Sequence, residues 1–295
     1  MLIDLHIHTN YSSDGELPPE EIFARVEEKQ IRYYSIADHN TVNGYLKLSE
    51  KYRVVGDITL IPAVEFSTFL DEHEIHVLSY GVNIKDASLK KAIDIINANK
   101  MKQAEERVKA LRKLGFTIDL NALIENAGKN VPSGVTFLNT LLSYKENQKL
   151  LQEYISGSKS DSPYTKFYFD HFAKGGKAHV HVPLIDIREF FEIMNGKAIF
   201  SLAHPKLYPD HLLKPLMEYP FDCIEVFSSY HNTSDIDTYK KLADEYGLGY
   251  TAGSDFHGPK VKPGIDLGVD TEYNERIIDY LLDNIHKRGL SVFYL

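Results

Sequence analysis

The chain has 295 residues, 43% of them hydrophobic and 25% charged, and its formal net charge at pH 7 is −9. This fits a globular protein with one large α/β domain or a domain with a smaller insertion. No run of about 18 apolar residues predicts a membrane-spanning helix, and the acidic balance argues against binding of long nucleic acid, which needs many basic contacts. The single cysteine, Cys223, excludes a disulfide framework, and no signal-peptide pattern is present, so a cytoplasmic location is expected.

Short apolar segments alternate with helical ones over much of the chain. Between the first two strands, Pro18-Pro19-Glu20-Glu21 predicts the start of a helix, because proline fits the first turn and acids favour the positive helix end. A further helix is predicted over 274–288 and a last strand over 291–294. The other predicted strands are 2–7, 33–37, 59–64, 75–80, 198–203, 223–227 and 249–252. This alternation predicts a parallel β/α architecture.

The middle of the chain departs from the alternation. A long polar helix is predicted from about 93 to 114, shorter helical pieces and a Ser/Gly/Lys-rich stretch at 156–162 follow, and a strand signal returns only at 177–182. We therefore predict a discontinuous barrel domain, 1–98 and 182–295, and a mainly helical insertion, 99–181, that caps one end of the barrel.

Two histidines lie on the first predicted strand. Side chains alternate along a strand, so His6 and His8 point to the same face, about 7 Å apart, while Ile7 points to the other. Two imidazoles in this arrangement can converge on one metal ion. By itself the pair is better explained by two ordinary half-buried histidines.

Further histidine, aspartate and glutamate residues lie at or just beyond the ends of the other predicted strands. In β/α barrels the carboxyl ends of the strands form the face where active sites are assembled. Acidic and imidazole groups gathered at one mouth repel one another and lose solvation unless cations neutralise them. Mixed imidazole and carboxylate ligands without thiolate favour Zn, Mn or Fe over Ca or Mg. The predicted metal ligands are His6, His8, Asp14, His39, Glu65, His76, His204, Asp255 and His257.

Four short strings closely resemble motifs of the PHP (polymerase and histidinol phosphatase) domain family. They are His6-Ile7-His8-Thr9, Ala37-Asp38-His39-Asn40-Thr41, Ala203-His204-Pro205 and Gly253-Ser254-Asp255-Phe256-His257-Gly258. Within this family, the chain most resembles stand-alone phosphoesterases, which include nucleoside 3′,5′-bisphosphate phosphatases and 5′-3′ exonucleases of short RNA. The resemblance covers residues 1–80 and 180–270 well. It implies a distorted (β/α)7 barrel that holds three divalent metal ions.

The resemblance also implies which residues bind each of the three ions. One ion would take His6, His8, Glu65 and Asp255, a second would take Glu65, His76 and His204, and a third would take Asp14, His39 and His257. The implied activity is hydrolysis of a small phosphorylated substrate, a nucleotide or an oligonucleotide end, by metal-activated water.

Two further residues are predicted to assist the reaction. Asp38, adjacent to His39, would orient a ligand or accept a proton, and we favour the orienting role. His231 would protonate the leaving oxygen; a histidine in a surface loop is the alternative interpretation.

Two departures from the family pattern bear on the substrate. Asn40 stands where the family often has Asp. Related nucleotide phosphatases carry an Arg-Pro-His-like motif whose arginine grips phosphate, and the matching stretch here, 131–137, has no arginine. Neither Ser nor Gly can replace an arginine–phosphate fork. The candidate substrate residues are therefore Arg107, Lys177 and Lys206, with solvated surface charges as the alternative, and His181, which with His179 is expected at the pocket rim.

Two rival functions stay open. A histidinol-phosphatase-like phosphomonoesterase would use the same metal ligands on another substrate. A non-catalytic metal-binding module would serve a partner protein, as in some polymerase-associated domains, but the complete ligand set and the absence of a polymerase segment count against it.

Overall fold

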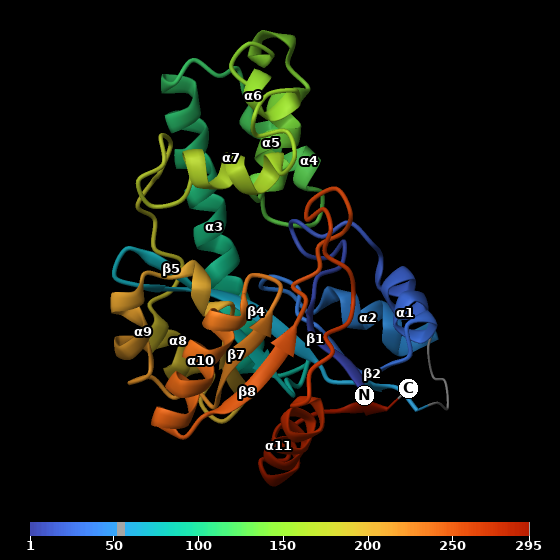
Figure 1. Cartoon of the computed structure of the whole chain (residues 1–295). Coiled ribbons are helices and arrows are strands. Elements are labelled where there is room, and N and C mark those ends of the chain that lie inside the picture. The colour runs from blue at the N-terminus through green and yellow to red at the C-terminus, as the bar shows by residue number, and fades with distance from the viewer. Residues whose placement is uncertain (52–56, 295) are drawn as a thin grey trace.

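Two β-sheets form the centre of the computed structural model, which describes residues 1–51 and 57–294 (Figure 1). The first sheet has the strand order β1-β2-β3-β9 and the second the order β4-β5-β6-β7-β8. The strands are β1 (Leu2–Ile7), β2 (Ile31–Ile36), β3 (Thr59–Leu60), β4 (Ala63–Leu70), β5 (His73–Tyr80), β6 (Ile199–Leu202), β7 (Cys223–Ser228), β8 (Gly249–Gly253) and β9 (Phe293–Tyr294). The fold is therefore a mixed α/β fold.

The sequence pattern predicted a parallel β/α architecture, but the sheets contain antiparallel pairs as well. β1, β2 and β3 run parallel to one another, as do β6, β7 and β8, but β4, β5 and β6 pair antiparallel. Only Asp71 and Glu72 separate β4 from β5, and a parallel connection needs a dozen residues or more. The predicted strand 59–64 is in fact β3 followed by β4. Pro62, which has no amide hydrogen to donate, lies at the break, and its carbonyl accepts the Gly81 amide at 2.7 Å.

Backbone hydrogen bonds connect the two sheets near their functional ends. The Asp255 amide donates to the His6 carbonyl at 2.8 Å, and the His8 amide donates to the Phe256 carbonyl at 2.9 Å. On the other side, the Asn40 amide donates to the Glu65 carbonyl at 3.0 Å. The segments that follow β1, β2 and β8 therefore meet beside β4.

Helices cover both sheets. Figure 1 shows α1 (Pro19–Glu28) and α2 (Asn43–Lys51) beside the first sheet, and α8 (Ile187–Ile193), α9 (Asp210–Leu216) and α10 (Thr233–Tyr246) beside the second. α11 (Asn274–Lys287) lies near the N-terminus, at the opposite end from the functional loops. Helix α1 starts at its proline with Glu20 and Glu21 in the first turn, as predicted.

A single long helix, α3 (Ala87–Lys113), leads away from the sheets. It begins six residues before the predicted start at 93, because the Asp86 carboxylate accepts the Ser88 amide at 2.7 Å and so caps it. In its first half Leu89 and Ile96 are buried in the core beneath the sheets. Its second half packs elsewhere.

That second half joins a group of short helices, α4 (Leu120–Ala127), α5 (Gly134–Leu142), α6 (Gln152–Ile155) and α7 (Pro163–His171), at the top of Figure 1. We call residues 99–181 the cap. Buried apolar side chains of the cap form a cluster of their own, which contains Val108, Leu111, Leu123, Phe137, Leu141 and Phe167. The cap therefore has its own hydrophobic core.

No strand forms at 177–182, within the described residues, although one was predicted. The Lys177 amide donates to the Asp170 carbonyl at 2.9 Å and the Ala178 amide to the His171 carbonyl at 2.8 Å. Since these amides are bound to the end of α7, the segment is a loop between the cap and α8. In the described part of the chain, no helix combines the length and apolar character needed to cross a membrane.

Candidate metal centre and substrate cavity

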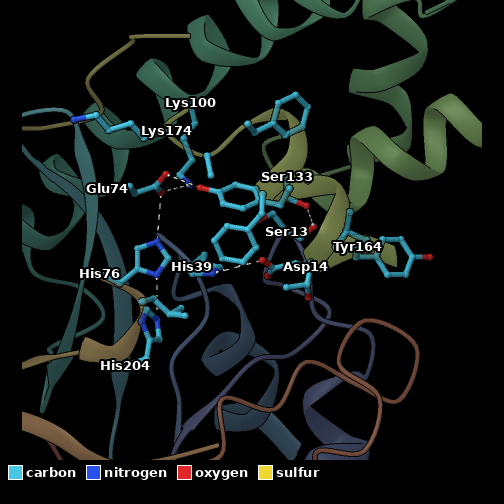
Figure 2. Close-up of a pocket in the computed structure, with 18 of the residues that line it drawn as sticks. Ser13, Asp14, His39, Glu74, His76, Lys100, Ser133, Tyr164, Lys174 and His204 are labelled. Atoms are coloured by element: carbon cyan, nitrogen blue, oxygen red, sulfur yellow. Dashed lines mark hydrogen bonds and ion pairs between the residues drawn. The ribbon is translucent and has the colours of Figure 1, made fainter. Parts of the chain in front are cut away.

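A cavity of about 530 Å³ lies between the strand ends and the cap (Figure 2). Its floor comes from the β-sheet loops and includes Asp14, His39, Glu65, His76, His204, Asp255 and His257. Its cap side comes from α3, the start of α5 and α7, and includes Lys100, Gln103, Arg107, Ser133, Tyr168 and Phe172. The cavity thus places a dense set of imidazoles and carboxylates opposite basic and aromatic side chains.

The first group of floor residues is His6, His8, Glu65 and Asp255, all buried. Glu65 Oε2 lies 3.3 Å from His6 Nε2 and 3.2 Å from His8 Nε2. Asp255 Oδ1 lies 3.2 Å and 3.1 Å from the same two nitrogens. Neither oxygen makes a hydrogen bond with any residue the structure describes. Four ligand atoms that converge, with both carboxylate oxygens left without hydrogen bonds, fit a bound cation.

Glu65 also belongs to a second group. Its other oxygen, Oε1, lies 3.0 Å from His76 Nδ1 and 2.9 Å from His204 Nε2. His39 Nδ1 approaches Glu65 Oε2 to 3.1 Å. One carboxylate thus faces imidazoles from both of its oxygens, as a bridge between two metal ions would.

A third group contains Asp14, His39 and His257, with His8 at its edge. Asp14 Oδ2 lies 3.5 Å from His39 Nε2, and Asp14 Oδ1 lies 3.7 Å from His257 Nε2. The Ser12 hydroxyl donates to Asp14 at 2.8 Å and accepts the His39 amide at 3.2 Å. Ser12, which the sequence analysis did not single out, therefore fixes this group.

Three floor residues have an unusual backbone. Asn40, His204 and Asp255 have φ values of +52°, +27° and +52°, and they are three of the five non-glycine residues with positive φ in the described chain. Each such residue costs about 1–3 kcal/mol and persists only where the surroundings hold it. Asn40, the departure from the family pattern, tolerates this conformation better than most residues. Its side-chain oxygen accepts the Ser67 amide at 3.0 Å.

Glu225 is the most important residue that the sequence analysis missed. Its Oε1 lies 2.9 Å from His6 Nδ1, and its Oε2 accepts the His204 amide at 2.7 Å. Because a carboxylate only accepts, His6 carries its proton on Nδ1 and keeps the Nε2 lone pair free for a metal. The available signal was a glutamate inside the apolar strand run 223–227.

Two more charged residues at the floor were also missed. Lys262 Nζ lies 2.9 Å from Asp255 Oδ2 and 3.8 Å above the Tyr230 ring. Glu74 Oε1 lies 3.4 Å from His76 Nε2 and 3.3 Å from Lys100 Nζ, so it connects the floor to the cap (Figure 2).

The electrostatics of the floor show an excess of negative charge. Burial would lower the pKa values of His8 and His76, but Glu65, with Asp255 beside His8, raises them to about 9 and about 10. Burial opposes ionisation of Glu65, yet the surrounding histidines hold its pKa well below the usual value. His8 and His76 thus take up protons to balance carboxylates, whereas burial lowers the pKa values of His39, to about 3, and of His257. Cations that bound there would displace the protons of His8 and His76.

Asp38 lies beneath the floor. It is buried and accepts the Thr9 amide at 2.6 Å and the Thr9 hydroxyl at 2.7 Å. It is not among the residues that line the cavity, and its two roles, orienting a ligand or accepting a proton, stay predictions.

The structure does not bring His231 to the cavity. Its Nδ1 donates to the Val226 carbonyl at 2.8 Å, and its ring packs 4.7 Å from that of Tyr239. The neighbouring Tyr230 lines the cavity in its place. The prediction of His231 as a proton donor is corrected accordingly, because the turn after β7 directs its ring toward α10.

Of the predicted substrate residues, only Arg107 lines the cavity, together with the rim residue His179. Lys177 and His181 are exposed and lie outside the lining, since 177–182 is a loop on the end of α7. Lys206 also lies outside it and pairs with Asp235 of α10. These three predictions are therefore not supported by position.

The chain is similar to known proteins over most of its length. A family model described as the PHP domain matches residues 4–281. The 5'-3' exoribonuclease Rnm of Escherichia coli (strain K12) is 25% identical over 91% of this chain and 88% of its own. The 3',5'-nucleoside bisphosphate phosphatase of Chromobacterium violaceum is 23% identical over 90% of each chain. A solved amidohydrolase from Chromobacterium violaceum, with bound SO4 and no metal, has the same fold, with a TM-score of 0.76 at 19% identity over 94% of this chain and 96% of that one.

Proposed function

Since the chain belongs to the PHP domain family, we propose that it is a metal-dependent phosphoesterase that hydrolyses a small phosphorylated substrate in the cavity above its strand ends. The observation that carries the proposal is Glu65, a buried carboxylate with histidines about both oxygens and no hydrogen bond at Oε2. A buried, unsatisfied carboxylate oxygen is costly unless a cation meets it.

We propose three metal positions, and the grouping of the side chains supports them. His6, His8, Glu65 and Asp255 would hold one ion, Glu65, His76 and His204 a second, and Asp14, His39 and His257 a third. The donor set suits Mn, Fe or Zn. When bound, such ions activate a water molecule as the nucleophile and neutralise phosphoryl oxygens.

The chain's own residues prepare these ligands. Glu225 fixes the proton of His6 on Nδ1, and Ser12 fixes the carboxylate of Asp14. Lys262 holds the outer oxygen of Asp255, which leaves the inner oxygen directed at the histidines. Ligands held in this way lose little entropy when a metal or substrate binds.

The nature of the substrate is proposed from the cavity and the relatives. Aromatic side chains line the cap side, with Phe172 buried, Tyr168 partly buried and Phe169 half exposed. A nucleobase stacks favourably on such rings. This supports a nucleotide or an oligonucleotide end, in line with the printed activities of the exoribonuclease and bisphosphate phosphatase relatives.

We further propose that the two sheets form the distorted (β/α)7 barrel of the family and that 99–181 is an insertion subdomain. The hydrogen bonds between Asp255 and His6 and between Asn40 and Glu65 support the first point, since they join segments of the two sheets. The separate apolar cluster of the cap supports the second.

The test is phosphate release by Mn-loaded protein on a panel of a nucleoside 3′,5′-bisphosphate, mononucleotides, a short RNA and histidinol phosphate. Turnover of a nucleotide or RNA, lost in His39→Ala with the fold retained, is the expected result. Preference for histidinol phosphate would favour the phosphomonoesterase alternative. No turnover of any compound, with metal bound, would contradict the proposal and favour a non-catalytic module.

A further inference from the structure

The histidines at the floor each have two ring nitrogens, and one of the two needs a hydrogen-bond acceptor if the other is to bind a metal ion. For four of these histidines the acceptor comes from the strands and loops of the floor. His6 Nδ1 lies 2.9 Å from Glu225, His8 Nδ1 lies 3.2 Å from the Ser12 hydroxyl, His257 Nδ1 lies 2.9 Å from the Asp255 carbonyl and His204 Nδ1 lies 3.4 Å from the Tyr208 hydroxyl.

His76 differs from these four, because its acceptor is tied to the cap. Its Nδ1 lies 3.0 Å from Glu65, whereas its Nε2 lies 3.4 Å from Oε1 of Glu74, on the same face of β5. Oε1 of Glu74 also lies 3.3 Å from Nζ of Lys100 on α3 (Figure 2). The hydroxyl of Tyr168 on α7 donates to Oε2 of Glu74 at 3.5 Å. Two elements of the cap therefore hold the acceptor for His76.

A second ion pair between the cap and the β4–β5 hairpin provides a comparison. Lys174 lies 2.9 Å from Glu72, in the turn of the hairpin, and these side chains are 47% and 59% exposed. The side chains of Lys100 and Glu74 are only 17% and 16% exposed. An exposed ion pair contributes little, whereas a desolvated charge loses much when its partner is removed. The inner pair is therefore the one that can hold a side chain in place.

The contact with Glu74 decides which nitrogen of His76 carries a proton. A carboxylate only accepts, so Nε2 donates to it and Nδ1 keeps its lone pair on the side of Glu65 and His204. If the carboxylate moves away, the ring can turn or change its tautomer, and the lone pair no longer faces the second group. The hold of the cap on Glu74 therefore reaches a predicted metal ligand.

We propose that Glu74 is a positioning residue through which the cap stabilises the second metal position. Lys100 and Tyr168 hold its carboxylate, and the carboxylate holds the ring of His76 with Nδ1 toward the metal. This role rests on the proposed function, in which His76 is a ligand. Such a linkage is reciprocal: contact with the cap strengthens metal binding, and metal binding tightens the contact of the cap by the same factor.

The decisive variant is Lys100→Met, with Lys174→Met as its matched control. Each removes one cation from the cavity wall, and by charge alone each should raise the affinity for a divalent cation, because a repulsion is lost. If Lys100 holds Glu74, Lys100→Met should instead lower the affinity for Mn²⁺ about fivefold at one of the three positions. Lys174→Met should leave that affinity unchanged or raised.

Titration of the EDTA-stripped proteins with Mn²⁺ against a competing chelator measures these affinities without any substrate. An unchanged or raised affinity in Lys100→Met would overturn the proposal, since the charge effect would then be the whole effect.

Two variants of Glu74 separate its two contacts. Glu74→Ala removes the acceptor and should lower the Mn²⁺ affinity of the same position about ten- to hundredfold. Glu74→Gln keeps an acceptor oxygen for His76 but loses the charge that attracts Lys100, so its loss should be smaller. Adding Lys100→Met to Glu74→Ala should cause no further loss, because the contact is already gone. Additive losses would refute the role of Glu74.

Hydrogen exchange tests the reciprocal effect. Mn²⁺ should slow the exchange of amides in α7 in the wild type and in Lys174→Met, but less in Lys100→Met and Glu74→Ala. Equal protection in all four proteins would contradict the link between cap and metal, even if phosphatase activity is found. A link seen in Mn²⁺ affinity and in exchange, without hydrolysis of any compound, would leave the role of Glu74 standing and sink the proposed function.

Discussion

The floor and the cap side of the cavity handle charge in different ways. On the floor, Glu65 and Asp255 each face two or more histidines, and a further partner holds the outer side of most ligands, such as Glu225 behind His6. On the cap side, the charges are held more loosely: Lys100 of α3 pairs with Glu74 at 3.3 Å, and the Arg107 guanidinium lies 4.4 Å from the centre of the Phe172 ring.

This difference indicates what each of the two surfaces is expected to bind. A network of interlocked ligands is rigid and suits metal ions, which require fixed geometry. Single cations among aromatic rings suit a substrate that arrives and leaves. The floor should therefore respond to substitution through metal content, and the cap side, apart from Lys100, through substrate affinity.

The largest effect should come from removing the charge of Glu65. Glu65→Gln keeps the size of the side chain but leaves the histidines of two groups without their shared anion. Hydrolysis should fall about a thousandfold or more, comparable to loss of a central electrostatic group, and elemental analysis should show lost metal. Glu72→Gln, at the cavity rim, is the control. A Glu65→Gln protein that keeps full metal content would contradict the proposed difference between the floor and the cap side.

A smaller effect, a loss of metal affinity, is expected from Glu225→Gln. The variant places an amide where His6 Nδ1 and the His204 amide both donate, so one of the two contacts becomes unfavourable. Metal affinity should fall about ten- to hundredfold, as for other partners of metal-bound histidines. Titration against a competing chelator measures it, with exposed Glu218→Gln as the control. Unaltered affinity would mean that Glu225 only fills space.

The contact between the two surfaces can be probed directly. The Ser133 hydroxyl donates to the Ser13 carbonyl at 2.7 Å, and the Asn130 amide group donates to the Ser12 carbonyl at 3.1 Å. Combined Asn130→Ala and Ser133→Ala should loosen the loop that carries Asp14 and weaken one metal site about fivefold per hydrogen bond. Metal titration and hydrogen exchange of 9–16 would detect this, with Asn139→Ala as the cap control. Unchanged exchange would show that the cap does not hold this loop.

The smallest effect concerns the stability of the cap and its pH dependence. Burial opposes ionisation of Asp170, but Lys159 and Tyr154 hold its pKa below 3.8. The contribution is therefore present above about pH 4 and is lost as the pH falls through the lowered pKa. Asp170→Asn should cost the cap about 1 kcal/mol at pH 7 and less at pH 2, which hydrogen exchange of α6 and α7 can measure. An equal loss at both pH values would contradict this assignment.

Much of the floor was predictable because it depends on local pattern. The alternation of His6 and His8 on a strand, and the acid and histidine residues that follow other strands, identify a common edge without any knowledge of pairing. All nine predicted ligands lie together in the structure, although their role as ligands stays a prediction. Glu225 was not predicted because its role depends on its contact with His6, which lies 219 positions away in the sequence.

The cap side was predicted poorly, again for a physical reason. Exposed basic residues look alike in a sequence, and only packing separates Arg107, turned into the cavity by α3, from Lys177 and His181 on a solvent-facing loop. Likewise, the strand expected at 177–182 does not form, because backbone amides of this segment donate to carbonyls at the end of α7.

The sequence by itself determined the kind of chemistry, since residue types and their spacing along strands fix which donors can converge. Only the tertiary structure decided which carboxylate lies between two groups, which histidine nitrogen keeps its lone pair and which cation lies against an aromatic ring. Those properties depend on distances between residues far apart in the chain, such as Arg107 and Phe172 or Lys262 and Tyr230, and no local pattern encodes them.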